Sequence, residues 1–295
     1  MAGYPLPEGF SDFDMFTFGS ALLVEGLLGF FLNSIAALSF LLIKEQQTPS
    51  NFLVFNLNIA DLMLNVNALL AAYASYVRVW PFGIDGCVLH GFQGMISILA
   101  AISFVALVSW DKYHYWCTKQ PLFWATSGTM CVMVWVTAIF WAALPLPSIG
   151  WGEYDFEPMR TCCCLDYTKG NWGYISYMLS ITVSYLFIPL VVMHSSYNSI
   201  YAYFKKTHSY KFNTNIPETT LLLTWGPYVL MCMYACVGNA RLVPPKYRMM
   251  LPVLAKTSPI FHAILYSFNN EAYRGGIWRL LTGQKVADNM ADKIK

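Results

Sequence analysis

The hydrophobic positions of this chain fall into seven long apolar stretches, which charged or turn-rich connections separate. A helix of about 20 apolar residues is long enough to cross a bilayer. Periodic apolar runs of this length between polar connections are typical of membrane-spanning helices. The pattern predicts an all-α membrane protein, a bundle of seven transmembrane helices, over Phe18–Ile43, Phe52–Val77, Val88–Trp110, Phe123–Leu146, Tyr174–Phe204, Thr219–Val237 and Met249–Phe268.

The composition agrees with this pattern and excludes several other classes of protein. Of the 295 residues, 57% are hydrophobic and 12% are charged, whereas a soluble domain carries roughly 25% charged residues. The net charge of +2 excludes a strongly basic protein that binds nucleic acid. The eight cysteines are scattered, which excludes a small disulfide-built domain. The chain shows no internal repeat, so nothing favours an inverted-repeat transporter.

The distribution of basic residues predicts the orientation of the bundle. With the N-terminus outside, eleven basic residues lie on the inner side and six on the outer side, as the preference of basic residues for the cytoplasmic side requires. The inner set is Lys44, Lys112, Lys119, Lys205, Lys206, Lys211, Arg274, Arg279, Lys285, Lys293 and Lys295; the outer set is Arg78, Arg160, Lys169, Arg241, Lys246 and Arg248. We therefore expect an outer or lumenal tail over residues 1–17, the bundle over 18–268 and an inner segment over 269–295.

The start of the inner segment has the spacing of an amphipathic helix. Tyr273, Ile277, Trp278 and Leu281 recur at helical intervals beside Arg274 and Arg279. Such a helix lies in the membrane interface with its apolar side toward the lipid. We expect a short amphipathic helix on the inner leaflet.

Three ionisable side chains, Glu25, Asp61 and Lys256, fall inside predicted spans. A charge at the bilayer centre costs at least ~3 kcal/mol, so each marks a candidate functional position. Glu25 is expected within two turns of the outer end of its helix, where water relieves the charge. Asp61 shares its span with four asparagines, which suggests a buried polar cluster that holds helices together or binds a cation.

Lys256 is the most informative of the three, because it is expected near the bilayer midplane, too deep to reach a headgroup layer. It is either a lysine paired with an acid of a neighbouring helix or a desolvated amine that attacks a carbonyl. The aromatic pair Trp225 and Tyr228 shares one face of the sixth helix, beside Pro227. Such a pair is either ordinary core or the flank of a long conjugated ligand that Lys256 binds.

The motifs of the whole chain resemble the opsin branch of the rhodopsin-like receptors. Asn33, Leu57-Asn58-Ile59-Ala60-Asp61, Cys87, Trp135, Cys163, Pro189, Tyr197, Trp225-x-Pro227-Tyr228 and Ala255-Lys256-Thr257 occur in the family's order. Lys256 is the most specific of these, since general receptors lack a lysine there. The resemblance implies that Lys256 binds retinal as a Schiff base.

Departures from the opsin pattern point to one branch. Helix three ends in Asp111-Lys112-Tyr113, with lysine in place of arginine, and helix seven reads His262-Ala263-Ile264-Leu265-Tyr266 without the usual Asn-Pro pair. His90 stands where vertebrate visual opsins carry a glutamate counterion. These features are most similar to the retinal G protein-coupled receptor opsins, which are related to retinochrome and peropsin.

The resemblance to that branch carries expectations about cofactor, partners and location. The dark protein is expected to hold all-trans-retinal, and light is expected to convert it to 11-cis-retinal for the visual cycle. The partners implied are retinal, the lipid bilayer and retinoid-processing proteins, with no nucleic acid. The expected location is the retinal pigment epithelium and Müller glia, including intracellular membranes.

The resemblance also assigns the site residues. Glu157, six residues before Cys163, aligns with the second-loop glutamate that is the counterion in many opsins. It is either the counterion in this chain too or a solvated acid of the loop. His90 is either part of the pocket or a loop-anchoring histidine, and Cys87 is expected to form a disulfide with Cys163. Further pocket positions are Gly91, Gly94, Ile98, Ile181, Tyr185, Leu221, Val229 and Pro252; the switch positions are Asp61, Asp111, Lys112, Tyr113, His262 and Tyr266. Cys232 and Cys236 are expected to pack rather than to bind a metal.

Three other functions compete with a photoisomerase. A light sensor that activates a G protein is disfavoured by Lys112, which lacks the planar fork of arginine. A receptor for a diffusible ligand is disfavoured by Lys256. A light-driven pump of the microbial type relies on helix-three acids, which the stretch Val88–Trp110 lacks.

Overall fold

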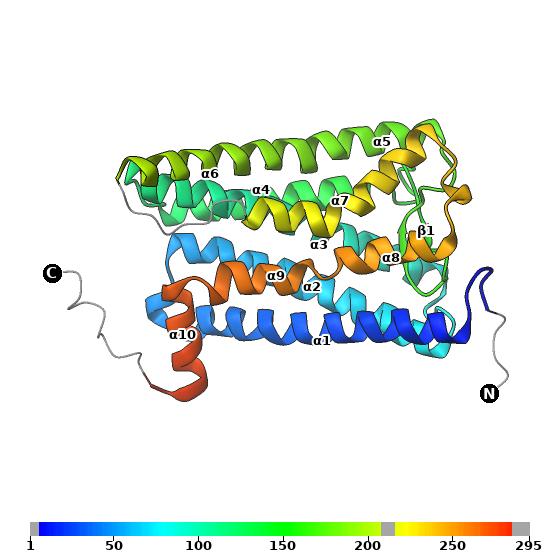
Figure 1. The fold of residues 1–295 in the computed structure, drawn as a ribbon, viewed down its shortest axis with the longest axis horizontal. Coiled ribbons are helices and arrows are strands. Elements are labelled where there is room, and N and C mark those ends of the chain that lie inside the picture. The colour runs from blue at the N-terminus through cyan, green and yellow to red at the C-terminus, as the bar shows by residue number, and fades with distance from the viewer. Residues whose placement is uncertain (1–5, 208–215, 285–295) are drawn as a thin grey trace.

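The computed structural model describes residues 6–207 and 216–284 and confirms the seven-helix bundle. The first four spans are α1 (Asp12–Leu42), α2 (Pro49–Val77), α3 (Gly83–Tyr113) with the π-helical turn η2 (His114–Thr118), and α4 (Trp124–Ala143). The fifth span comprises α5 (Trp172–Thr182), the π-helical turn η3 (Val183–Phe187) and α6 (Ile188–Lys206). The sixth is α7 (Ile216–Val237), and the seventh comprises α8 (Pro245–Ala255), α9 (Ser258–His262) and the π-helical turn η5 (Ala263–Phe268). These helices lie side by side in Figure 1. The short 3-10 turns are η1 (Lys44–Gln46) and η4 (Ala240–Leu242).

Most helices extend beyond their predicted apolar stretches, whereas α4 is shorter than the predicted Phe123–Leu146. The first helix begins at Asp12 rather than Phe18, because Ser11 and Asp14 form a reciprocal capping box at its start. Thr48 caps α2, and Pro49 occupies its first turn. These polar caps satisfy the first N–H groups of a helix. A pattern of apolar residues does not reveal such caps, so it cannot locate the helix ends that they set. Of the basic residues used for the orientation, Lys211, Lys285, Lys293 and Lys295 lie outside the described residues.

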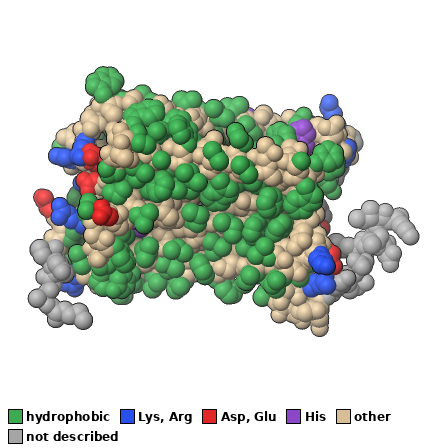
Figure 2. Space-filling model, turned by 180° about the vertical axis from the view of Figure 1, so that it is seen from behind, with side chains coloured by type: hydrophobic (Ala, Val, Ile, Leu, Met, Phe, Trp, Pro, Cys, Tyr) green, Lys and Arg blue, Asp and Glu red, His purple; other side chains and the backbone are tan. Residues whose placement is uncertain are grey.

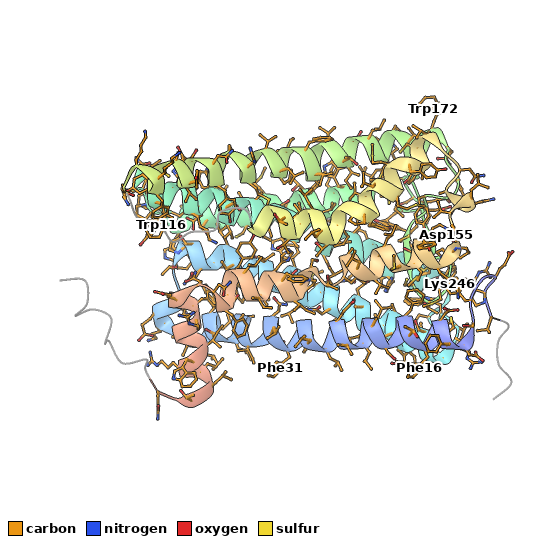
Figure 3. All side chains as sticks on the ribbon, viewed as in Figure 1. Phe16, Phe31, Trp116, Asp155, Trp172 and Lys246 are labelled. Carbon is orange, nitrogen blue, oxygen red and sulfur yellow. A yellow bond between two sulfur atoms is a disulfide. The ribbon has the colours of Figure 1, made fainter. Side chains whose placement is uncertain are left out.

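Apolar side chains form a belt around the bundle, with charged side chains gathered at its two ends (Figure 2). Phe31 on α1 and Leu230 on α7 are 60% and 71% exposed. Figure 3 places Asp155, Trp172 and Lys246 at one end and Trp116 at the other. Because so much exposed apolar surface is costly in water, the belt is the surface that contacts lipid.

The sequence suggested that the polar side chains of α2 form one buried cluster. In the structure they are buried, but they contact several different helices. Trp135 of α4 donates to Asn56, and Asn67 donates to the His90 carbonyl of α3. Asn65 packs where Gly29 of α1 leaves room, since a Cβ at Gly29 would lie 2.4 Å from its Oδ1 atom. Buried amides that each reach a different helix stabilise the bundle where lipid offers no competing partner.

The seventh span is interrupted at Lys256 and Thr257, between α8 and α9. Pro259 has no N–H to donate to the carbonyl of Ala255, and its ring clashes with that carbonyl. The amide of Lys256 donates to both the Pro252 and the Val253 carbonyls, and the amide of Thr257 donates to the Leu254 carbonyl, each at 3.1 Å, so the backbone tightens from four-residue to three-residue hydrogen bonds here. The break presents Lys256 at an irregular point of the backbone, which is tolerated at membrane depth only where protein or a cavity surrounds it.

A two-stranded hairpin closes one end of the bundle, which we call the lid end. Strands β1 (Tyr154–Phe156) and β2 (Cys163–Leu165) pair antiparallel, with Phe156 opposite Cys163. The predicted disulfide between Cys87 and Cys163 is present and joins β2 to the start of α3. Tyr154 Oη donates to the Ala142 carbonyl of α4 at 2.7 Å. Gly91 of α3 has no side chain where β1 crosses it, since a Cβ there would lie 2.6 Å from the Tyr154 ring.

The predicted helix after the seventh span is α10 (Glu271–Thr282). Tyr273 and Ile277 are buried against the bundle, whereas Trp278 and Leu281 are exposed. Gln46 Nε2 donates to the Tyr273 carbonyl at 2.7 Å, and Gly276 leaves the space in which Gln46 lies. The helix therefore has one face on the bundle and an apolar edge free to meet lipid.

Candidate functional site

An apolar cavity of about 140 Å³ lies inside the bundle beneath the lid. Helices α2, α3, α5, α7 and α8 and the turn η3 supply its wall, and the lid supplies its roof. The lining residues are Leu64, Asn67, Gly91, Gly94, Met95, Ile98, Leu99, Ile102, Glu157, Cys162, Cys163, Cys164, Leu165, Met178, Ile181, Thr182, Tyr185, Leu186, Trp225, Tyr228, Val229, Cys232, Pro252 and Lys256. A mostly apolar cavity with a few converging polar groups is the usual form of a small-molecule site.

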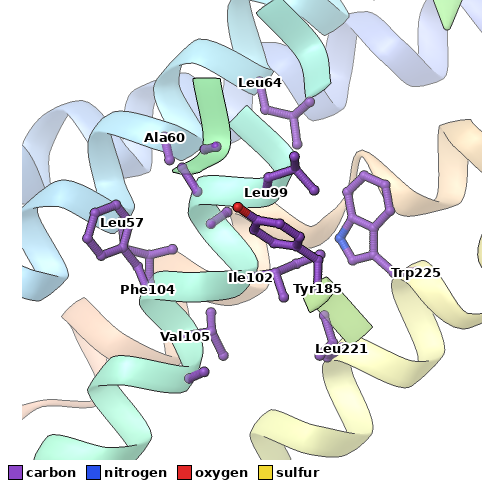
Figure 4. Close-up of a cluster of buried hydrophobic side chains, with 14 of the residues drawn as sticks. Leu57, Ala60, Leu64, Leu99, Ile102, Phe104, Val105, Tyr185, Leu221 and Trp225 are labelled. Carbon is purple, nitrogen blue, oxygen red and sulfur yellow. The ribbon is translucent and has the colours of Figure 1, made fainter. Parts of the chain in front are cut away.

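Aromatic side chains shape the middle of the cavity. Trp225 and Tyr228 of α7 lie edge to face, with ring centroids 6.4 Å apart. Figure 4 shows Trp225 and Tyr185 turned toward Leu99 and Ile102 of α3. Pro227 lies inside α7 between Trp225 and Tyr228, where it removes one backbone hydrogen bond. These residues provide flat apolar walls for an extended ligand.

Lys256 supplies the amine of the cavity. No ion pair to this amine is found within 4.0 Å among residues 6–207 and 216–284. The groups that act on it electrostatically are Glu25 of α1, His90 of α3, and Glu157 and Cys162 of the lid. A half-buried primary amine at the wall of an apolar cavity can add to a carbonyl.

Glu157 is the acid of the lid that faces the cavity, and its side chain is 2% exposed. Burial raises the pKa of its carboxyl, while hydrogen bonds from Cys164 and Tyr167 and the charges of Lys256 and Arg248 oppose that rise. Tyr167 Oη donates to Glu157 Oε2 at 3.3 Å. The lone solvated acid that the sequence allowed is therefore excluded, because Glu157 is enclosed.

Two free thiols flank the disulfide in the roof of the cavity. Burial raises the pKa of Cys162 to about 12 and raises that of Cys164 well above its usual value. Both remain neutral thiols at physiological pH. Of the lid side chains that line the cavity, Glu157 is therefore the one that can carry a negative charge.

His90 and Leu221 are not among the residues that line the cavity. The His90 ring is buried, and its Nε2 lies 3.1 Å from the Asn67 carbonyl while Cys163 N–H reaches Nδ1 at 3.4 Å. A neutral ring protonated at Nε2 donates to the first group and accepts from the second. His90 thus anchors the lid to α2 and α3. Leu221 lies next to Trp225 in the buried core (Figure 4).

The other predicted pocket residues, Gly91, Gly94, Ile98, Ile181, Tyr185, Val229 and Pro252, line the cavity with Trp225, Tyr228, Glu157 and Lys256. The residues of the cavity wall that the prediction missed are Leu64, Asn67, Met95, Leu99, Ile102, Cys162, Cys164, Leu165, Met178, Thr182, Leu186 and Cys232. The run of three cysteines was a visible signal for the lid, but sequence alone does not show which of their side chains face inward.

Comparison with known proteins agrees with this geometry. The profile described as "7 transmembrane receptor (rhodopsin family)" matches residues 32–266. The RPE-retinal G protein-coupled receptor of Mus musculus is 40% identical over 280 residues, covering 95% of this chain and 96% of that protein. This chain belongs to the rhodopsin family, in the RPE-retinal receptor branch. The visual pigment-like receptor peropsin of Homo sapiens is 24% identical, covering 86% of this chain and 80% of that protein. The structure of squid rhodopsin superposes with a TM-score of 0.84 at 22% identity, over 97% of this chain and 92% of that one, which supports the fold.

The residues predicted to be switch positions form contacts among the second, third and seventh spans. His262 Nδ1 lies 3.1 Å from Asp61 Oδ1, both side chains being buried. Lys112 Nζ lies 5.0 Å from the centre of the Tyr266 ring, and Asp111 accepts from Ser50 at 3.0 Å. Tyr113, next to Lys112, is half-buried against the core. In this receptor, therefore, a cation–π contact joins the third and seventh spans.

The described residues hold no group of three or more His, Cys, Asp or Glu side chains that could bind a metal ion. Cys232 lines the cavity, and Cys236 Sγ faces the Cys232 carbonyl one turn away.

Proposed function

We propose that this opsin-type receptor holds all-trans-retinal at Lys256 and that light converts it to the 11-cis isomer. The observation that carries the proposal is Lys256 itself, an amine at the wall of an apolar, aromatic-lined cavity. The name of its relatives, RPE-retinal G protein-coupled receptor, and the order of opsin motifs in the chain add to it. The residues fit the cofactor, because its aldehyde needs an amine and its polyene needs an apolar, flat-walled space.

Retinal supplies the light absorption and the double bonds that rotate. The chain's own residues hold the cofactor, shape the space around its polyene and shield it from water. Lys256 would bind the aldehyde carbon through its Nζ atom. The aromatic rings of Trp225, Tyr228 and Tyr185 restrict the space in which the bonds of the polyene can twist. The lid excludes water from the cavity. Light supplies the energy for the rotation, so no general acid or base is required for it, and the shape of this wall selects the bond that rotates.

Glu157 is proposed as the counterion of the nitrogen when that nitrogen is charged. A buried cation needs an anion nearby, and α3 carries no acid along its cavity-lining residues. Glu157 faces the cavity from the lid and acts electrostatically on Lys256. A charge at Lys256 in turn favours the ionised form of Glu157.

A second candidate function is light-dependent activation of a G protein, which the family membership favours. An arginine at position 112 would offer a planar fork of hydrogen-bond donors. Lys112 offers a single point charge, which lies on the face of the Tyr266 ring. The seventh span also lacks the Asn-Pro hinge, since His262 binds Asp61 instead.

We therefore expect little activation. Nucleotide exchange by added G protein, measured with retinal-loaded protein before and after illumination, should stay near the dark level. A visual opsin assayed beside it supplies the positive control. Light-dependent exchange comparable to that opsin would make signalling the main function and contradict this expectation.

We further propose that the N-terminus and the lid face the outer or lumenal side, in membranes of the pigment epithelium and Müller glia. The excess of basic residues on the opposite side supports the orientation, and the letters RPE in the relatives' name support the pigment epithelium; the glial location rests on the family resemblance alone.

A further inference from the structure

Contacts at two depths fix how α1 and the seventh span lie against each other. Both run from the lid end toward the opposite end (Figure 1). Near the lid end, Lys246 Nζ lies 2.8 Å from Asp14 Oδ2. Deeper in the bundle, Asn33 Nδ2 donates to the Pro259 carbonyl at 3.2 Å. The two elements are therefore held in one register along their shared length.

This register brings Glu25 and Lys256 to the same depth. Glu25 is eleven residues beyond Asp14, and Lys256 is ten beyond Lys246, which corresponds to about 16 Å and about 15 Å of helix. One turn before them, Leu22 and Val253 belong to the same buried cluster. The expectation that Glu25 lies within two turns of a helix end is wrong, because α1 begins at Asp12 and Glu25 is more than three turns inside it.

The carboxyl of Glu25 lacks a hydrogen-bond partner of its own. Its Oε2 atom is buried and receives no hydrogen bond from the part of the chain that the structure describes. The charge that acts on it is that of Lys256. A carboxyl oxygen buried without a hydrogen bond is costly, and so is an ammonium group at the wall of an apolar cavity, whereas two opposite charges at one depth offset part of that cost.

We propose that Glu25 is the resident charge partner of the Lys256 amine in the ligand-free protein and sets the pH at which this amine becomes reactive. The proposal rests on the proposed function in taking Lys256 as the amine that binds an aldehyde. Only the neutral amine has the lone pair that adds to a carbonyl carbon. An anion that stabilises the ammonium form therefore raises the pH needed for addition. Glu157 faces the same amine from the lid beside the neutral thiol of Cys162, and the neutral ring of His90 lies on α3, so Glu25 is the acid that acts from the side of α1.

The test measures the reactivity of Lys256 in the full chain without retinal. Short pulses of formaldehyde and cyanoborohydride are given across a range of pH, and methylation of the Lys256 peptide is followed by mass spectrometry. Glu25→Gln should lower the pH of half-maximal labelling by about one unit or more, which means roughly tenfold more labelling at a pH below both midpoints. Glu25→Asp, which keeps the charge, should stay near the wild type, and Glu8→Gln in the exposed tail should not move the midpoint.

An unchanged midpoint in Glu25→Gln overturns the proposal, and a shift confined to Glu157→Gln assigns the partner charge to the lid instead. Because no retinal is used, failure to bind retinal leaves this result interpretable. If Glu25→Gln does not fold, infrared spectroscopy of Lys256→Met provides the second reading. Loss of the Lys256 cation should protonate Glu25 and produce a new carboxylic-acid band. Adding Glu25→Asp to the Lys256→Met protein should shift the frequency of this band, which assigns the band to residue 25. Absence of any new band overturns the proposal as well.

Discussion

Replacing Lys256 with alanine should abolish covalent capture of all-trans-retinal. Lys256 is the amine among the residues that line the cavity, and the apolar wall offers the aldehyde no other nucleophile of comparable strength, since burial keeps Cys162 and Cys164 as neutral thiols. Purified protein incubated with retinal and reduced with borohydride should carry one adduct, on the peptide that contains Lys256. In Lys256→Ala the adduct and the pigment band should both fall to background.

Lys246→Ala is the matched control for this experiment. Lys246 belongs to the same span but lies at the lid end (Figure 3), exposed and paired with Asp14. Its loss removes a surface ion pair worth about 0–1 kcal/mol and should leave adduct formation intact. Pigment formation by Lys256→Ala, or an adduct on another lysine of the wild type, would show that the assignment is wrong.

Replacing Glu157 with glutamine should change the pH dependence of the pigment more than any other single substitution in the lid. The loaded protein is expected to show a visible band when the linked nitrogen is protonated and a near-ultraviolet band when it is neutral. An anion favours the charged form, so its removal should move the exchange between the bands to lower pH, by about one unit or more. At a pH between the two midpoints, the wild type should absorb in the visible and Glu157→Gln in the near-ultraviolet.

The lid offers a control in Glu153→Gln. Glu153 belongs to the same connection but is paired with Lys169, with a side chain that is 46% exposed. Neutralising it should leave the spectral titration in place, as solvent screens an exposed charge. If Glu157→Gln titrates like the wild type, Glu157 does not compensate the charge of the nitrogen, and Glu25 is then the remaining acid that acts on Lys256.

The hydropathy pattern was sufficient to predict the seven spans, because a lipid-facing helix must be apolar along its length. It could not place the helix ends, which depend on local caps such as Ser11 and Thr48. It also could not predict the depth of Glu25, since the start of α1 at Asp12 is set by a capping box and not by hydrophobicity.

Lys256 could be singled out from sequence because a lysine inside an apolar stretch is costly. The roles of His90 and Asp61 could not. His90 meets Cys163, 73 residues away, and Asp61 meets His262, 201 residues away. No periodicity encodes such pairs, and the sequence left His90 as either a pocket residue or a loop-anchoring histidine without showing what its ring would contact.

The isomers of retinal recovered before and after illumination test the central proposal most directly. The full chain is loaded with all-trans-retinal in the dark, one half is illuminated, and both halves are extracted and separated by chromatography. We expect all-trans-retinal from the dark half and a gain of 11-cis-retinal from the illuminated half, with no such gain in Lys256→Ala. An illuminated sample that returns only all-trans-retinal, or a mixture identical to that of free retinal under the same light, would contradict the account.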